Sequence, residues 1–258
     1  MKRWLVVAGI LVVAGLIIST VCLTVVGFDF SKLGTSVMVT NTYTTEEAFT
    51  NIRLDAITAD IIFVPSEDGG VKVVCYENEK IPYSVYVEGD SLVITCKDNR
   101  KWYDHIGFNW ETNTVTVYLP AGEYGDLQLK CTTGDVTMPQ DFHFAKANVK
   151  VTTGDVLWKA NVDENLTIHS TTGDTTLAGM TCGTLDVKAT TGDVTLDHMD
   201  AAKLDIKVTT GDVEGTLLSS KKFEVKVTTG KVDVPKTTEG GTCRVKATTG
   251  NVKLKIAQ

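Results

Sequence analysis

The stretch VKATTGDVTL (187–196) decides how this chain folds. Its centre, Thr-Thr-Gly followed in most copies by Asp, occurs seven times in the second half of the sequence. The first Thr of each copy stands at 132, 152, 171, 190, 209, 228 and 248, so successive copies are 19 or 20 residues apart. A short and constant period is typical of a solenoid, in which each copy forms one coil that stacks on the coil before it.

Residues on either side of each copy alternate between apolar and polar types. Five and three residues before the first Thr the position is apolar in every copy, as at Leu185 and Val187, and Lys188 follows as a polar position. This period of two predicts strands with one inward face. The Gly of each copy is expected where the chain turns sharply and needs a conformation closed to residues with a Cβ. The repeat therefore predicts parallel strands joined at Thr-Thr-Gly corners.

The same pattern fits IRLDAITADIIFV (52–64), which would add an eighth coil. Residues 65–126 indicate a strand-rich insertion, with strands expected over 71–77, 83–89, 91–97 and 114–120, and we expect its hairpins to cap the first coils. Lys253 and Lys255 would place charge on the last exposed strand and so protect its edge. We therefore expect an all-β solenoid domain over 51–258 after a stalk over 29–50.

An uncharged, mostly apolar run covers residues 4–28. It is long enough to cross roughly 30 Å of hydrocarbon as a helix. It is also longer than the apolar region of a cleaved signal peptide, which is the alternative interpretation. Lys2 and Arg3 before the run predict a cytoplasmic N-terminus. We therefore expect residues 1–28 to form a signal-anchor transmembrane helix of a single-pass cell-membrane protein, with the repeats outside the cytoplasm.

Composition excludes some classes of function. A net charge of −7 over 258 residues argues against a general nucleic-acid partner. Five cysteines at irregular spacing follow the apolar run, and an odd number argues against a disulfide framework, although a bond between Cys75 and Cys96 on neighbouring strands stays open. The sequence shows no Cys or His cluster with the spacing of a metal site.

The repeat, together with the motif Val115-Thr116-Val117-Tyr118-Leu119-Pro120 before it, is similar to a bacterial domain family of unknown function whose members are labelled adhesins. The resemblance covers residues from about 50 to about 256 and implies a right-handed parallel β-helix. Some relatives are single-span proteins of Gram-positive bacteria associated with cell-envelope stress, which agrees with the anchor inferred above. The resemblance supplies no catalytic residues.

An acidic residue follows the corner Gly in five of the seven copies, at Asp135, Asp155, Asp174, Asp193 and Asp212. Carboxylates stacked about 4.8 Å apart repel one another, and Ca²⁺ with its oxygen ligands would relieve the repulsion. We favour the alternative that each side chain caps backbone N–H groups at a corner, because Asp and Asn do so in turns and Lys231 interrupts the row. No other cofactor is expected.

A row of lysines occupies the outward position two residues before the first Thr: Lys130, Lys150, Lys188, Lys207, Lys226 and Lys246. Such a row could hold an anionic polymer, for example a wall phosphate chain. Asp186, Asp205 and Glu224 in the adjacent outward positions favour the alternative, in which the charges of this face pair with one another.

The loop 97–113 concentrates aromatic residues, with four of them within the nine residues from 102 to 110. Trp102, Tyr103, His105, Phe108 and Trp110 form the candidate partner-binding site, since aromatic loops on rigid scaffolds often bind partners. The alternative is that these rings fold back over the open end of the coil stack.

The histidines are scattered, and no Ser/His/Asp or paired-carboxylate pattern stands out, so we expect no enzymatic activity. The sequence favours a non-catalytic, extracytoplasmic interaction or adhesion module, whose partner is an unknown protein or a cell-wall polymer. A regulatory component of envelope-stress sensing that acts on a membrane partner is the first alternative, and a polysaccharide-active β-helix enzyme is the remote one.

Overall fold

The structure, a computed structural model, describes residues 2–25, 37–101 and 112–257. The chain divides into two compact units, Met1–Val37 with Arg100–Glu111 and Met38–Asn99 with Thr112–Gln258. The first unit holds α1 (Lys2–Val25), whose side chains at 7–21 are exposed. Among the described residues no helix combines the length and the apolar character that a membrane crossing needs, so the span predicted over 4–28 is not supported.

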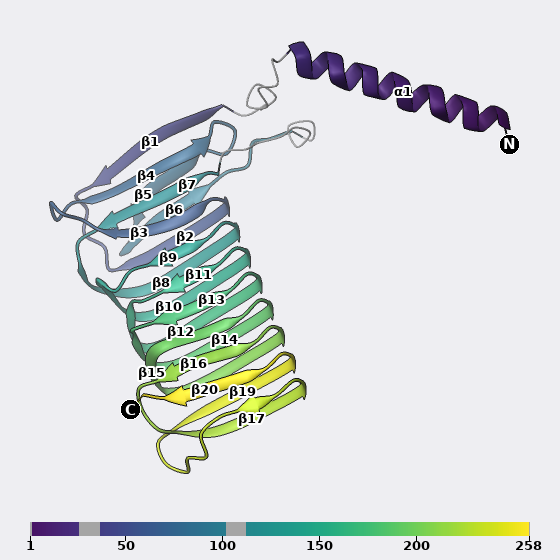
Figure 1. The fold of residues 1–258 in the computed structure, drawn as a ribbon. Coiled ribbons are helices and arrows are strands. Elements are labelled where there is room, and N and C mark those ends of the chain that lie inside the picture. Colours follow the sequence, from purple (N-terminus) through teal and green to yellow (C-terminus); the bar gives the residue numbers. More distant parts are fainter. Residues whose placement is uncertain (1, 26–36, 102–111, 258) are drawn as a thin grey trace. The chain divides into compact units, whose positions relative to one another are not determined.

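The second unit is built from twenty strands in one mixed, largely parallel sheet that curves until it is nearly closed (Figure 1). The first seven strands are β1 (Met38–Thr45), β2 (Asn51–Thr58), β3 (Asp60–Pro65), β4 (Val71–Asn78), β5 (Tyr83–Glu88), β6 (Ser91–Cys96) and β7 (Thr114–Leu119). The next seven are β8 (Gly122–Thr133), β9 (Val136–Met138), β10 (Phe142–Thr153), β11 (Val156–Trp158), β12 (Asn161–Thr172), β13 (Thr175–Ala178) and β14 (Thr181–Thr191). The last six are β15 (Val194–Thr210), β16 (Val213–Leu217), β17 (Lys221–Thr229), β18 (Val232–Asp233), β19 (Gly241–Thr249) and β20 (Val252–Ile256).

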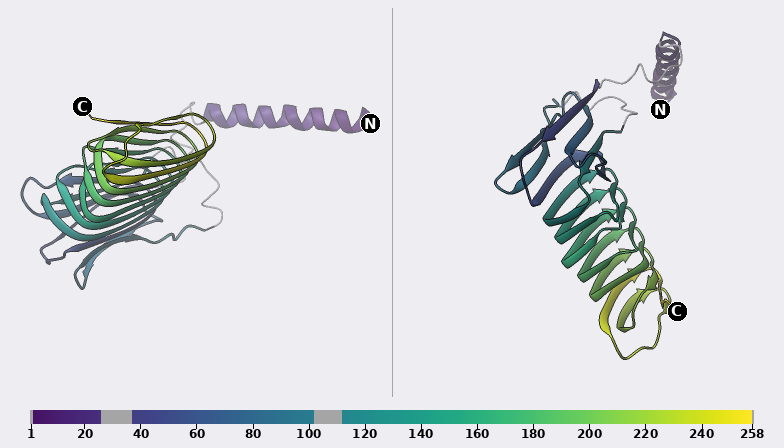
Figure 2. Two further views of the ribbon diagram at one scale, coloured as in Figure 1. Left: turned by 90° about the horizontal axis from the view of Figure 1, so that it is seen from below. Right: turned by 90° about the vertical axis from the view of Figure 1, so that its left-hand side faces the viewer.

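Each repeat forms one coil, made of a long strand, a Thr-Thr-Gly corner and a short strand. Thr153, Thr172, Thr191 and Thr210 lie side by side in successive coils, which confirms the 19-residue spacing. We call the layer of long strands sheet B and the layer of short strands sheet A. Figure 2 shows the stacked coils from two further sides. The handedness of the winding stays a prediction.

Strands far apart in the sequence are neighbours in both layers, and β15 contributes to each. Sheet B has the order β5-β6-β2-β8-β10-β12-β14-β15-β19-β17. Sheet A has the order β1-β4-β7-β3-β9-β11-β13-β15-β16-β20-β18. The three pairs β1–β4, β4–β7 and β5–β6 are antiparallel and lie at the same end of the stack.

The structure confirms the strands expected between 65 and 126 but corrects their arrangement. The coil of β2 and β3 stacks directly on that of β8 and β9, so the stack is not interrupted. On its other side β6 and β7 add a further parallel coil, in which the loop 97–113 replaces the Thr-Thr-Gly corner. Residues 38–45 of the predicted stalk form β1, which pairs with β4. Without β1, the outer edge of β4 would be unpaired at this end of the stack. Residues 38–45 cover that edge as an additional strand.

The far end of the stack also departs from the sequence order. β19 and β20 insert between β15/β16 and β17/β18, so the yellow strands of Figure 1 do not form the end. Lys253 therefore lies between Glu214 of β16 and Asp233 of β18. The prediction that Lys253 protects an exposed edge is therefore wrong. β18 ends at Asp233, so Lys255 lies beyond it and has Thr216 of β16 as its strand neighbour on one side only.

The inward positions form the core that the period of two predicted. Leu127, Leu166, Leu185 and Leu204, which share one column, are each at most 1% exposed. Trp158 is fully buried between the layers and its Nε1–H donates to the carbonyl oxygen of Ala160 at 2.7 Å. Apolar burial along the whole stack is therefore the main source of stability.

One inward position carries an unneeded hydroxyl. Thr175 is fully buried in a column that holds Val156 and Val194 in the adjacent coils, and its Oγ1 has no hydrogen-bond partner within the described residues. Thr175→Val should therefore raise the free energy of unfolding by about 1 kcal/mol, measured by chemical denaturation. Thr176→Val, on the outward side of the same strand, is the control and should change it by less than about 0.5 kcal/mol. A loss of stability in Thr175→Val would contradict this account of the column.

Candidate binding groove on the outer face of sheet B

The acidic column after the corners forms a ladder of hydrogen bonds. The backbone N–H of Asp155 donates to Oδ1 of Asp135 at 2.8 Å, and Asp174, Asp193 and Asp212 repeat the contact at 2.7 to 2.8 Å. The ladder continues through Asn251, whose side chain accepts from the N–H of Lys231 in the outermost coil. Each carboxylate thus accepts an N–H from the next coil, which is the chemistry of a turn cap. Within the described ranges no group of three or more His, Cys, Asp or Glu residues is arranged to hold a metal.

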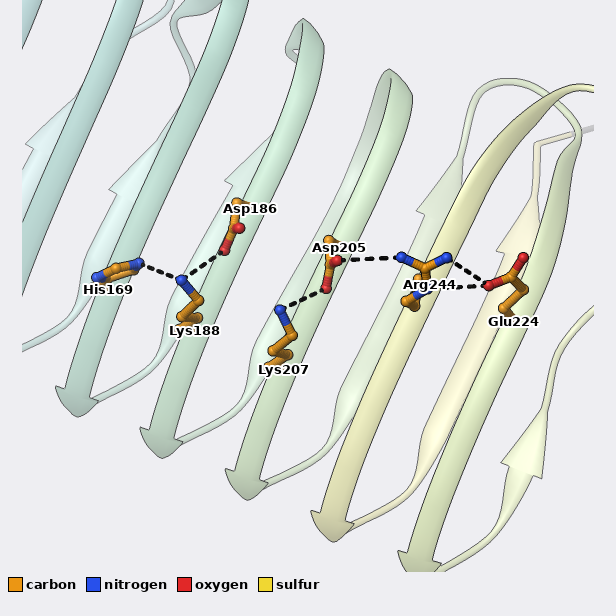
Figure 3. A network of polar contacts seen from close by, with 7 residues as sticks. All are labelled: His169, Asp186, Lys188, Asp205, Lys207, Glu224 and Arg244. Atoms are coloured by element: carbon orange, nitrogen blue, oxygen red, sulfur yellow. Dashed lines mark hydrogen bonds and ion pairs between the residues drawn. The ribbon is translucent and has the colours of Figure 1, made fainter.

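Charged side chains pair with one another on one half of the outer face of sheet B (Figure 3). Lys188 lies 3.7 Å from Asp186, and Lys207 lies 3.3 Å from Asp205. Arg244 bridges Asp205 at 3.7 Å and Glu224 at 2.9 Å. On β14 and β15 the lysines are therefore paired with acidic neighbours, and Arg244 of β19 is paired with Glu224 of β17. The side chains of Lys226 and Lys246 in the same row have no hydrogen bond or ion pair within the part of the chain that the structure describes.

His169 of β12 marks the boundary of this paired region. Its Nε2 lies 3.2 Å from the Nζ of Lys188. Partial burial and the positive charge of Lys188 hold the pKa of His169 below its usual value. The neutral form of the ring is therefore favoured, and its Nε2 can accept a hydrogen bond from the ammonium group of Lys188.

The other half of the face is different, because its acidic column becomes neutral. The positions that hold Asp186 and Asp205 in later coils hold Gln128, Asn148 and Thr167 on β8, β10 and β12. Lys130 keeps only a contact of 3.7 Å with Asp55. Lys150 and Arg53 have no hydrogen bond or ion pair within the part of the chain that the structure describes. Their charges are available to a ligand.

These side chains line a groove of about 520 Å³ across β2, β8, β10 and β12. Four basic side chains, Arg53, Lys130, Lys146 and Lys150, line it against two acidic ones, Asp55 and Asp126. The amides of Gln128, Asn148 and Asn165 and the hydroxyl of Thr167 also line it. The groove is thus basic on a chain whose net charge is −7, and its amides can donate and accept hydrogen bonds.

Local irregularity of the backbone helps to shape one end of the groove. The register between β10 and β12 shifts between Phe144 and Lys146, so one strand carries an extra residue there. Such bulges bend a strand and redirect side chains. Lys146 follows the shift and pairs with Glu164 at 3.2 Å. A bulge has no simple sequence signature, which is one reason why the sequence did not reveal the groove.

The five cysteines that follow α1, Cys75, Cys96, Cys131, Cys182 and Cys243, are free thiols in the structure. Cys75 lies on β4 of sheet A and Cys96 on β6 of sheet B, so they are not on neighbouring strands and form no disulfide. Burial raises the pKa of Cys75 to about 12 and that of Cys131 to about 11, so both stay protonated. Protonated buried thiols serve as small core residues.

The aromatic candidates Trp102, Tyr103, His105, Phe108 and Trp110 lie outside the described residues. The end of their loop is fixed at the corner column, because Asn113 donates from Nδ2 to the carbonyl oxygen of Thr58 at 2.7 Å. The carbonyl oxygen of Asn113 accepts from the N–H of Asp60 at 2.9 Å. The binding role of the loop stays a prediction.

Residues 49–258 match the Toastrack DUF4097 family. The chain belongs to this family. No curated protein shows significant similarity to this Toastrack DUF4097 chain. The family description states no ligand, so the groove has to be interpreted from its own side chains.

The solved structures that match this chain are distant from it in sequence. A "putative adhesin" from Bacteroides fragilis is 16% identical, with a TM-score of 0.49 over 87% of this chain and 99% of that one. A "putative adhesin" from Parabacteroides merdae is 13% identical, with a TM-score of 0.46 over 87% and 98%. A "putative cell adhesion protein" from Clostridium sporogenes is 13% identical, with a TM-score of 0.40 over 86% and 100%.

Proposed function

We propose that this Toastrack DUF4097 domain is a non-catalytic binding module that holds an anionic, hydroxyl-rich chain, such as a cell-wall polymer, in the groove across β2, β8, β10 and β12. The observation that carries the proposal is the change of one column from acidic to neutral at Thr167. Where Asp186 and Asp205 neutralise the lysines, the face is self-paired. Where Gln128 and Asn148 replace them, Arg53 and Lys150 have no acidic partner within the described residues and are left to bind something else.

The chemistry of the lining favours this class of ligand. Arg53, Lys130 and Lys150 supply positive charge along the direction of stacking, with one strand every 4.8 Å or about that distance. A chain laid along that direction would meet a new cation at each coil, which suits a polymer with repeated anionic groups. The amides between the cations would bind hydroxyl groups, which both donate and accept hydrogen bonds.

A non-catalytic role is supported by the surroundings of the histidines. His143 contacts Asp163 at 2.7 Å, and His198 contacts Asp197 at 2.5 Å. In the described part of the chain neither ring is hydrogen-bonded to a Ser or Cys side chain. These pairs therefore lack the Ser or Cys nucleophile of a Ser/His/Asp or Cys/His hydrolytic site. Placement of the domain outside the cytoplasm stays a prediction from the sequence.

The proposal is tested with the full-length chain and a poly(glycerol phosphate) chain as the probe. Replacing two groove cations, Arg53→Gln with Lys150→Gln, should raise the dissociation constant about tenfold, because two charge-assisted contacts are lost. The matched control, Lys188→Gln with Lys207→Gln, removes the same charge from the self-paired region and should change it less than about twofold. Isothermal titration calorimetry measures both, and binding should weaken as salt is added.

Two results would count against the proposal. If both double variants bind poly(glycerol phosphate) equally weakly, the polymer is attracted by net charge and not by the groove. If a neutral dextran binds as tightly as poly(glycerol phosphate), the cations have no role in binding. If no polymer binds and crosslinking in cells captures one fixed membrane protein, the regulatory alternative becomes the better account.

A further inference from the structure

The stack of coils ends in two strands that have a neighbour on one side only. β17 pairs with β19 and β18 pairs with β20, and neither has a second strand beside it among the described residues. The segment between β18 and β19 passes the start of β17, where Thr237 Oγ1 donates to the carbonyl oxygen of Lys221, and it leaves the edge from Phe223 to Val227 without a strand. The inward side chains of β17 are only half-buried, whereas their neighbours in the next coil are buried. These inward residues are Phe223, Val225 and Val227, and their neighbours are Cys243, Val245 and Ala247. Val232 of β18 is 48% exposed. The end of the core is therefore incompletely covered.

We propose that this end binds a second copy of the chain, with β17 pairing antiparallel to its counterpart about a two-fold axis at Val225. In that register Phe223 lies opposite Val227 of the other copy on the inward side, and Glu224 lies opposite Lys226 on the outward side. Each contact occurs twice because of the symmetry. Apolar pairs and opposite charges directly across an antiparallel pair both stabilise it.

The charges select this register over its neighbours. If the axis passed through Glu224, that carboxylate would face itself and Lys222 would face Lys226. If it passed through Lys226, two ammonium groups would face each other. Like charges directly opposite destabilise strand pairs. If the axis passed between two residues, each inward side chain of one copy would lie opposite an outward side chain of the other. The apolar inward side chains of one copy would then face solvent.

The corner of the last coil favours an antiparallel partner over a parallel one. In the coils from Asp60 to Asn251 the side chain after the corner Gly accepts the N–H of the next coil. In the outermost coil this position is Lys231, whose side chain has no acceptor. A parallel copy that continued the stack would bring an N–H to that corner and leave it without its cap. An antiparallel copy brings its own corner to the other end of β17.

The proposal does not depend on the groove, but it would change how the groove works. β14, β15 and β19 separate β17 from the groove strand β12, so pairing at β17 leaves the groove open. The two-fold axis is perpendicular to sheet B, so both grooves lie on the same face of a continuous sheet. One long polymer could then occupy both, which would raise the apparent affinity through the second, intramolecular contact.

The first test is the mass of the full-length chain by sedimentation over a concentration series, with a charge reversal. The unmodified chain should form dimers, and Lys226→Glu should raise the dimer dissociation constant about tenfold, since two attractions become repulsions. This change leaves the contact between Arg244 and Glu224 in place. Adding Glu224→Lys to Lys226→Glu should restore most of the affinity.

The second test fixes the register by disulfide crosslinking under mild oxidation. Val225→Cys should give a crosslinked dimer, because Val225 faces itself across the axis and its Cβ atoms come within reach of a disulfide. Glu224→Cys alone should not, since its counterpart is Lys226, whereas a mixture of Glu224→Cys and Lys226→Cys chains should. The unmodified chain measures the background from its own cysteines.

A monomer throughout the series, with the far-ultraviolet spectrum of a folded β protein, would overturn the proposal and leave the lysines of β17 as protection of a free edge. A series of ever larger oligomers would also overturn the two-fold axis. Such a series indicates head-to-tail pairing, for example of β17 with the edge strand β5 of the next copy. Because polymer binding is measured separately, failure here leaves the function proposed for the groove intact.

Discussion

Replacing Gly192 by Ala should lower the free energy of unfolding by about 4 kcal/mol, a large effect for a single methyl group. Gly192 has a φ of +136°, which a residue with a Cβ rarely adopts. A Cβ built there would lie 2.0 Å from the carbonyl oxygen of Gly173 in the adjacent coil. The backbone would have to separate two coils, which breaks ladder hydrogen bonds on both sides of the corner.

Chemical denaturation with a matched control separates the clash from the backbone strain. Gly69 also has a positive φ, +72°, but a Cβ there would have no atom within 4 Å. Gly69→Ala should therefore cost only about 1 to 2 kcal/mol, which is the price of the left-handed conformation. If Gly192→Ala costs no more than Gly69→Ala, the close contact between coils does not explain why Gly recurs in every corner.

Removing the charge of Lys221 should cost about 3 to 5 kcal/mol, because it leaves a partly buried carboxylate without its partner. The Nζ of Lys221 contacts Oδ1 of Asp200 at 2.5 Å, and the lysine side chain is 3% exposed. Lys221 lies beside Gly241 of β19, and its side chain reaches past that strand to Asp200 of β15. The pair thus links β17 to β15, which lies two strands away in sheet B because β19 is inserted between them.

The variant for this test is Lys221→Met, and its control is Lys207→Met. Lys207 contacts Asp205 at 3.3 Å on the exposed face, so its loss should change the free energy of unfolding by less than about 1 kcal/mol. Equal costs in the two variants would show that the Lys221 contact contributes no more than a surface pair.

The contribution of this pair should also depend on pH. Burial raises the pKa of Asp200, but hydrogen bonds from Lys221 and Ser219 and the charge of Lys221 outweigh it and leave the pKa below its usual value. The pair therefore stabilises the fold fully above the unfolded value of about 3.9, and this stabilisation is lost as the pH falls through the lowered folded value. The difference between the unmodified chain and Lys221→Met should shrink over that acidic range.

The sequence was sufficient for the parts of the fold that repeat. The spacing of Thr-Thr-Gly predicted the corners, and the period of two predicted which residues of β8 to β15 are buried. It did not predict the order of the coils at either end. Local patterns are the same whether β19 follows β17 in the stack or inserts before it, and only long-range contacts such as that of Lys221 with Asp200 distinguish the two.

The candidate site was predictable only in part. The row that contains Lys130 and Lys150 was visible in the sequence, but all its members looked alike. The difference between its two halves depends on the adjacent column, where Gln128 and Asn148 stand in place of acids. That change was readable from the alignment of the repeats, whereas the extra residue of β12 opposite Lys146, at one end of the groove, was not predicted.

The central claim is that the half of sheet B around Lys150 binds an anionic chain. Lysine footprinting tests it most directly: the full-length chain is acetylated with and without poly(glycerol phosphate), and the modification of each lysine is read by mass spectrometry. The account predicts protection of Lys130 and Lys150 with no change at Lys188 and Lys207. Uniform protection along the whole lysine row, or protection confined to Lys188 and Lys207, would contradict it.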